Sequence, residues 1–126
     1  MKKLLMIDDD EIYLTMAENI LEEKYEIITA KSGKEAIEIL LKGITPNLIL
    51  LDILMPNMDG WMTYNRLRGI SLIKDVPIAF LTSLDGSNEK THALEIGASD
   101  YITKPYERDD LIKRIEKIIN KKEKKK

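Results

Sequence analysis

Short apolar runs alternate with segments of helical periodicity along this chain, and this alternation constrains its fold more than any other feature. The runs at residues 4–7, 48–51 and 76–81 lack polar alternation, which favours strands buried on both faces. Two weaker runs cover residues 25–29 and 99–102. Strands that alternate with helices in this way are typical of an α/β fold with a parallel sheet.

Five helical segments are expected between and after these runs, at residues 11–23, 34–42, 58–68, 87–96 and 107–120. The last segment begins with acidic residues and ends with lysines, which matches the helix dipole. The first segment places the apolar residues Ile12, Met16, Ile20 and Leu21 on one side of the helix, and this pattern predicts its buried face.

The net charge of −2 is unevenly distributed along the chain. Residues 121–126 contain five lysines and one glutamate, so residues 1–120 carry a net charge of −6. We expect residues 1–120 to form a single domain that does not bind nucleic acid directly, and residues 121–126 to be a solvated, Lys-rich helix end. No apolar run approaches the ~20 residues of a membrane span, and no signal-peptide pattern is present. The chain has no cysteine, which suits the cytoplasm.

Polar side chains follow four of the five predicted strands, at the point where each strand ends. Asp8, Asp9 and Asp10 follow the first strand, and Asp52 follows the third. Thr82 ends the fourth strand, and Lys104 comes soon after the fifth. In open parallel sheets, ligands bind beyond the carboxyl ends of the strands, so we expect these side chains to converge.

Converging carboxylates need a positive partner, because two like charges ~4 Å apart repel by about 4 kcal/mol at an effective dielectric of ~20. Oxygen ligands with room for water suit Mg²⁺. Asp52, beside Mg²⁺, Lys104 and the Thr82 hydroxyl, is placed to act as a nucleophile that forms an acyl phosphate. We interpret Asp10 mainly as a helix N-cap.

Four segments, in this order and spacing, closely resemble the receiver domains of response regulators in two-component signal transduction: residues 4–10, 48–60, 79–83 and 97–105. The resemblance covers residues 2–120. It implies a flavodoxin-like, doubly wound sheet of five parallel strands in the order 2-1-3-4-5, with helices on both faces, as in chemotaxis regulators.

The resemblance also implies roles for individual residues. Asp52 would accept a phosphoryl group from a sensor histidine kinase, and Lys104 would bind the phosphate. Asp9 would be a direct Mg²⁺ ligand and Asp8 a ligand through water. Asp52 and the Leu54 carbonyl would complete the protein ligands.

A switch is implied as well, with Thr82 and Tyr101 as the coupled pair. Phosphorylation would draw the Thr82 hydroxyl inward and let Tyr101 turn from an exposed to a buried position. The affected face would be formed by the fourth helix, the fifth strand and the fifth helix. The bond between Lys104 and Pro105 is expected to be cis.

Other functions fit the sequence less well. A hydrolase with an aspartyl nucleophile would have an acid two residues after it, where this chain has Leu54. A flavin-binding protein would lack the acidic loop after the first strand, because that loop repels phosphate. We expect a signalling domain that assists its own phosphorylation and dephosphorylation, rather than an enzyme. It would switch a separate protein, pass the phosphoryl group to a phosphotransfer protein, or be one part of a longer regulator.

Overall fold

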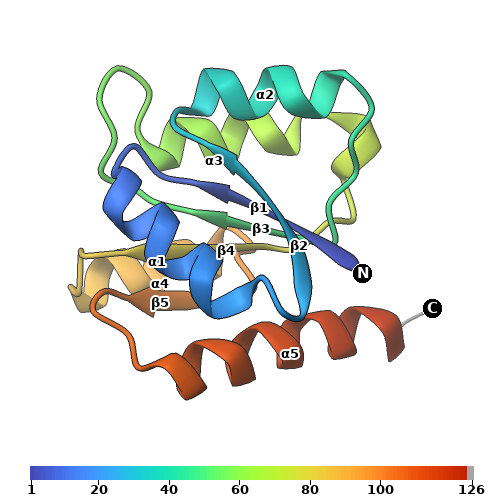
Figure 1. The fold of residues 1–126 in the computed structure, drawn as a ribbon. Helices are drawn as coiled ribbons and strands as arrows, with labels where there is room; N and C mark the ends of the chain where they lie inside the picture. The colour runs from blue at the N-terminus through green and yellow to red at the C-terminus, as the bar shows by residue number, and fades with distance from the viewer. Residues whose placement is uncertain (125–126) are drawn as a thin grey trace.

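Five parallel strands form the centre of the molecule in a computed structural model that describes residues 1–124. The sheet has the order β2-β1-β3-β4-β5, and every neighbouring pair is parallel. Figure 1 shows this sheet between two layers of helices. The predicted strand order is confirmed. The strands are β1 (Lys2–Ile7), β2 (Tyr25–Ala30), β3 (Leu48–Leu51), β4 (Ile78–Thr82) and β5 (Tyr101–Thr103).

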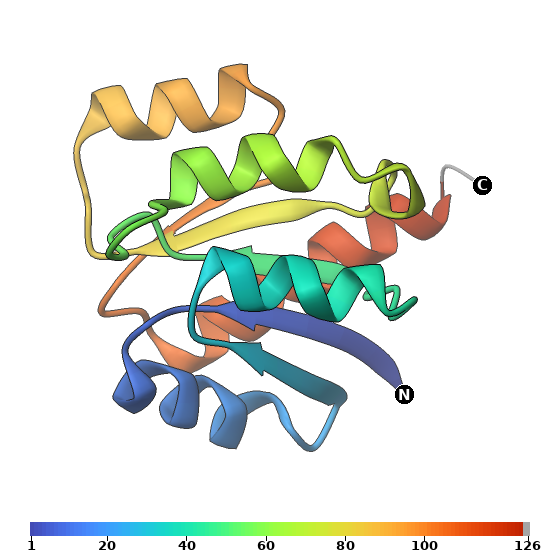
Figure 2. The ribbon, with the colours of Figure 1, turned by 90° about the horizontal axis from the view of Figure 1, so that it is seen from above.

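Helices cover both faces of the sheet, as expected for a doubly wound fold. Helices α2, α3 and α4 lie on one face, and α1 and α5 lie on the other (Figure 2). A short 3₁₀ turn, η1 (Ser71–Ile73), precedes β4. The helices are α1 (Glu11–Leu21), α2 (Gly33–Leu41), α3 (Gly60–Arg68), α4 (Ser87–Glu95) and α5 (Arg108–Lys124).

The alternation of side chains along each strand divides the apolar core into two layers. In β1, Leu5 and Ile7 pack in the layer under α2, α3 and α4, whereas Leu4 and Met6 pack in the layer under α1 and α5. All four side chains are buried. A strand buried on both faces needs apolar residues at consecutive positions, which explains the unbroken apolar runs in the sequence.

The buried face of α1 agrees with the predicted one at Ile20 and Leu21 but differs from it at Ile12 and Met16. Ile12 is 71% exposed and Met16 is 48% exposed, whereas Leu14, Ala17 and Leu21 are buried. Asp10 caps the helix by accepting a hydrogen bond from the Ile12 N–H at 2.9 Å, as interpreted from the sequence. This cap fixes where the helix starts, and Ala17 packs in the core between the helix and the sheet.

Helix α5 continues beyond the expected end of the domain at residue 120. It is helical to Lys124, and Glu123 forms an ion pair with Lys2 at the start of β1. The predicted Lys-rich tail therefore begins inside α5, and its last two residues, 125 and 126, lie outside the described part of the chain. No helix within residues 1–124 has the length and apolar character that crossing a membrane requires.

Candidate phosphorylation site

Three carboxylates meet at the carboxyl ends of β1 and β3. These strands pair with Ile7 opposite Leu51, so the residues that follow, Asp8 and Asp52, lie next to each other. One oxygen from each of Asp8, Asp9 and Asp52 lies within 4.8 Å of the other two. Asp8 and Asp52 are buried, and Asp9 is exposed. The cluster predicted from the sequence is thus assembled, and its oxygen-only donors fit a hard cation such as Mg²⁺.

Lys104 reaches the same cluster from the end of β5. Its Nζ lies 2.5 Å from Asp8 Oδ2 and 3.3 Å from Asp52 Oδ2. Its backbone N–H donates to the Thr82 carbonyl at 2.8 Å, which ties the loop to β4. The bond between Lys104 and Pro105 is cis, as expected. One buried ammonium therefore faces two buried carboxylates.

The charges of this cluster influence one another strongly. Burial raises the pKa of the Asp8 carboxyl above its ordinary value, and the nearby charge of Asp52 adds to this effect, although Lys104 opposes it. Burial alone would lower the pKa of the Lys104 ammonium, but the hydrogen bond to Asp8 and the charge of Asp52 outweigh burial and raise it. The single lysine thus remains charged but does not fully offset the carboxylates.

The two residues expected to form the switch pair lie close to the cluster. Thr82 is fully buried, and its hydroxyl accepts a hydrogen bond from the Leu84 N–H at 3.4 Å. The Tyr101 hydroxyl donates to the Leu84 carbonyl at 2.5 Å. Tyr101 is only 3% exposed, so the exposed starting position expected for it is wrong for this conformation. Packing against Phe80, with ring centroids 6.3 Å apart, holds the ring inside.

Leu54 occupies the remaining predicted ligand position. Its N–H donates to Asp52 Oδ1 at 3.3 Å, so its backbone lies beside the Asp52 carboxylate. Its side chain is 51% exposed. The other Asp52 oxygen is the one that faces Lys104.

Two tyrosines at this site were not predicted from the sequence. The Lys104 Nζ lies 4.1 Å from the centre of the Tyr13 ring, a cation–π contact. The Tyr106 hydroxyl is buried without a hydrogen-bond partner among the described residues. Tyr13 lies one helical turn after Asp9, and Tyr106 follows Pro105 directly. This closeness in sequence to Asp9 and Pro105 was the available signal for the two tyrosines. A periodic apolar pattern does not indicate a contact with a lysine that follows another strand.

Comparison with known proteins agrees with this geometry. Residues 4–116 match the family model described as the response regulator receiver domain. The chain is 38% identical over 125 residues to the alkaline phosphatase synthesis transcriptional regulatory protein PhoP of Bacillus subtilis, a match that covers 97% of this chain and 50% of PhoP. The chain thus spans about half the length of this relative.

Solved structures give the same result. A CheY-like response regulator receiver domain protein from Methanospirillum hungatei superposes with a TM-score of 0.89 at 28% identity, covering 100% of this chain and 99% of the other. A putative response regulator from Chloroflexus aurantiacus gives 0.87 at 35% identity, covering 94% and 98%. Because the family model matches residues 4–116, which is most of the chain, this chain belongs to the response regulator receiver domain family.

Proposed function

We propose that Asp52 of this receiver domain accepts a phosphoryl group from a phosphohistidine on a sensor histidine kinase. An Asp52 oxygen would form a bond to phosphorus as the phosphorus–nitrogen bond of the phosphohistidine breaks, and the released imidazole would take up a proton. The observation that carries this proposal is the meeting of Asp8, Asp9, Asp52 and Lys104 at one edge of the sheet.

We propose Mg²⁺ as the cofactor of this reaction. Asp8, Asp9 and Asp52 supply the oxygen ligands that this ion prefers, and the Leu54 carbonyl is the proposed backbone ligand. When bound, Mg²⁺ would neutralise charge on the phosphoryl oxygens. Asp9 is the exposed member of the cluster, which suits a ligand on an ion that keeps some of its water.

Lys104 and Thr82 would hold the transferred group. The Lys104 ammonium already lies 3.3 Å from Asp52 Oδ2, so it could pair with a phosphoryl oxygen after a small movement. The Thr82 hydroxyl accepts a hydrogen bond from the Leu84 N–H and can donate its own proton to another phosphoryl oxygen. The same groups would assist hydrolysis of the acyl phosphate, and this hydrolysis would reset the domain.

The proposed output is a protein-binding face formed by α4, β5 and α5. A phosphoryl group at Asp52 would give Thr82 a new acceptor and weaken its contact with Leu84, whose carbonyl holds the Tyr101 hydroxyl. The proposed recipient is a downstream protein or a phosphotransfer protein in the cytoplasm, without direct contact with nucleic acid.

Labelling with a small phosphodonor tests the proposal. The protein is incubated with acetyl phosphate and Mg²⁺, and the phosphorylated residue is identified by mass spectrometry. Asp52→Asn should not be labelled, and Asp10→Asn should be labelled like wild type because asparagine can also cap α1. EDTA should suppress labelling. Equal labelling of Asp52→Asn and wild type would refute the assignment of the acceptor, and equal labelling in EDTA would refute the role of the metal.

A further inference from the structure

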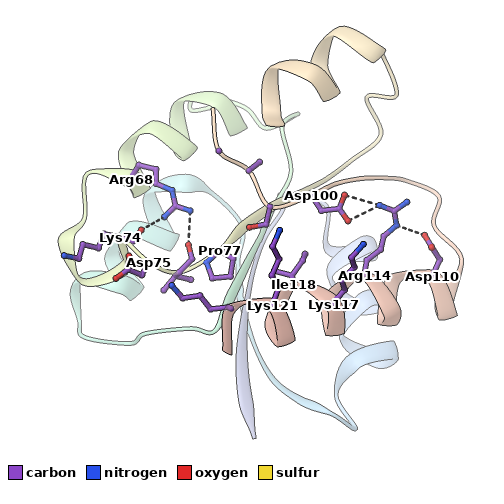
Figure 3. A pocket seen from close by; sticks show the side chains of 15 residues that line it. Arg68, Lys74, Asp75, Pro77, Asp100, Asp110, Arg114, Lys117, Ile118 and Lys121 are labelled. Atoms are coloured by element: carbon purple, nitrogen blue, oxygen red, sulfur yellow. Dashed lines mark hydrogen bonds and ion pairs between the residues drawn. The ribbon is translucent and has the colours of Figure 1, made fainter. Parts of the chain in front are cut away.

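A large groove lies at the opposite end of the strands from Asp52, where β4 and β5 begin. It has a volume of about 760 Å³ and lies between the connection that precedes β4 and the helix α5. Figure 3 shows Arg68 and Lys74 on one side of this groove, Lys117 and Lys121 of α5 on the other, and Pro77 between them.

Positive charge in this groove is mostly uncompensated. The Arg68 guanidinium donates to the carbonyls of Ile73, Lys74 and Val76 at 2.8–3.4 Å, which fixes its charge in place, and no carboxylate of residues 1–124 pairs with it. By contrast, Arg114 is neutralised by Asp100 and Asp110.

Most of the remaining charged side chains in the groove are lysines. Within residues 1–124, no ion pair engages Lys74, Lys117, Lys121 or Lys122, and Asp75 is the one lining carboxylate that is also unpaired. A chain with a net charge of −2 thus holds a cationic groove, and Lys121 and Lys122 of α5 contribute to it.

The groove also has an apolar floor. Val76 and Ile118 are largely buried and line it together with Pro77 and Ala98. Lys74, Lys117 and Lys121 are exposed around this floor. A flat membrane surface does not enter a groove, and a nucleic acid backbone offers no apolar side chains to such a floor. A polypeptide segment with both acidic and apolar side chains can pair with the lysines and also contact the apolar floor.

The spacing of the lysines along α5 indicates how such a segment would lie. Lys117 and Lys121 are four residues apart, which corresponds to about 6 Å along a helix axis. In an extended chain, side chains at every second position are about 6.6 Å apart and point to the same side. Lys124 continues the row beyond Lys121.

We propose that this groove binds an extended, acidic segment of a partner protein in which acidic residues alternate with apolar ones. The acidic side chains would pair with Lys117, Lys121 and Arg68, and the apolar ones would contact Val76 and Pro77. The segment would bind away from the carboxylates of the phosphorylation site, which repel it. This proposal does not depend on phosphorylation of Asp52.

A binding titration tests this proposal on the unphosphorylated chain. A fluorescein-labelled peptide of alternating glutamate and leucine is titrated with the protein, and its fluorescence anisotropy is measured at low and at physiological ionic strength. Binding should weaken with salt, and a control peptide with glutamine in place of glutamate should bind at least tenfold more weakly.

Matched variants locate the site. Lys117→Gln with Lys121→Gln should raise the Kd about fivefold or more, because two lysines would lose partners. Lys34→Gln with Lys42→Gln removes the same charge from exposed positions on and beside α2 and should change the Kd less than twofold. Ser99→Glu, which places a carboxylate in the groove without removing a lysine, should also weaken binding. Circular dichroism checks that each variant is folded.

Several results would overturn the proposal. Equal losses in the two lysine pairs would mean that only net charge matters, and wild-type affinity of Ser99→Glu would mean that the peptide does not enter the groove. Vesicles containing phosphatidylserine, and a single-stranded oligonucleotide, are titrated in parallel. Tighter binding of either through Lys117 and Lys121 would assign the groove to that class of ligand instead.

Discussion

Asp9 should destabilise the metal-free protein, because it lies in a cluster of like charges and forms no ion pair with any of the described residues. Its carboxylate oxygen lies within 4.8 Å of oxygens from Asp8 and Asp52, and the ion pairs of Lys104 go to those two residues. At 4.8 Å, two such charges repel by about 3.5 kcal/mol at an effective dielectric of ~20 and by about 0.9 kcal/mol in water. Because Asp9 is exposed, the lower figure applies, and the two pairs together cost about 1–2 kcal/mol.

Asp9→Asn should therefore raise the free energy of unfolding in EDTA by about 1–2 kcal/mol. Urea denaturation followed by circular dichroism measures this change as a higher midpoint at unchanged m-value. Asp10→Asn is the matched control, since it removes the same charge one residue away and leaves a residue that can cap α1. We expect Asp10→Asn to stay within about 0.5 kcal/mol of wild type.

Mg²⁺ should remove most of this difference in stability. At a free concentration ten times its Kd, the ion stabilises wild type by about 1.4 kcal/mol, because it binds the native state only. Asp9→Asn should lose most of this gain, whereas Asp10→Asn should keep it. The reasoning is refuted if Asp9→Asn is no more stable than Asp10→Asn in EDTA, or if Mg²⁺ stabilises both variants equally.

Three further outcomes are expected at the same site. Burial raises the pKa of Asp8, so the native state takes up a proton at a higher pH than the unfolded state does, and this group favours folding increasingly as the pH falls toward the ordinary value of 3.8. The stability of wild type relative to Asp8→Asn, measured by urea denaturation, should therefore rise as the pH falls toward 3.8. Tyr13→Leu removes the ring beside the Lys104 ammonium and should slow labelling by acetyl phosphate about threefold, whereas Tyr13→Phe should retain the wild-type rate. Leu54→Asn with Leu84→Glu should speed loss of the phosphoryl group about tenfold, because polar side chains there can orient an attacking water; decay no faster than in wild type would exclude these leucines as a barrier.

The arrangement of the acidic cluster could be predicted because it depends on topology alone. In the strand order that the family resemblance implies, the strands at residues 4–7 and 48–51 are parallel neighbours, so Asp8 and Asp52 must meet at their carboxyl ends. The register of Ile7 with Leu51 confirms this expectation. The acids, the lysine and the strand order needed no knowledge of side-chain conformation.

Features that depend on packing could not be predicted in the same way. The α1 prediction gave weight to the large residues Ile12 and Met16, but the buried positions include Ala17, which contributes little to an apolar pattern. The inward position of Tyr101 depends on Phe80 and on the Leu84 carbonyl, which belong to other segments. The cationic groove joins Arg68 to lysines of α5 that are about fifty positions away in the sequence.

The acidic cluster at the carboxyl ends of the strands and the cationic groove at their amino ends carry opposite charges. The distance between these two regions determines how they could influence each other. Strand β4 has five residues, which places its first and last residues about 13 Å apart at roughly 3.3 Å per step. This exceeds the Debye length of about 8 Å at physiological ionic strength, so a charge added at Asp52 is largely screened at the groove. A chain of contacts connects Tyr101 to the groove. The Tyr101 N–H donates to the Asp100 carboxylate at 2.8 Å, and Arg114 pairs with the same carboxylate at the groove. Any effect of phosphorylation on binding in the groove should therefore pass through the start of β5, rather than directly through space.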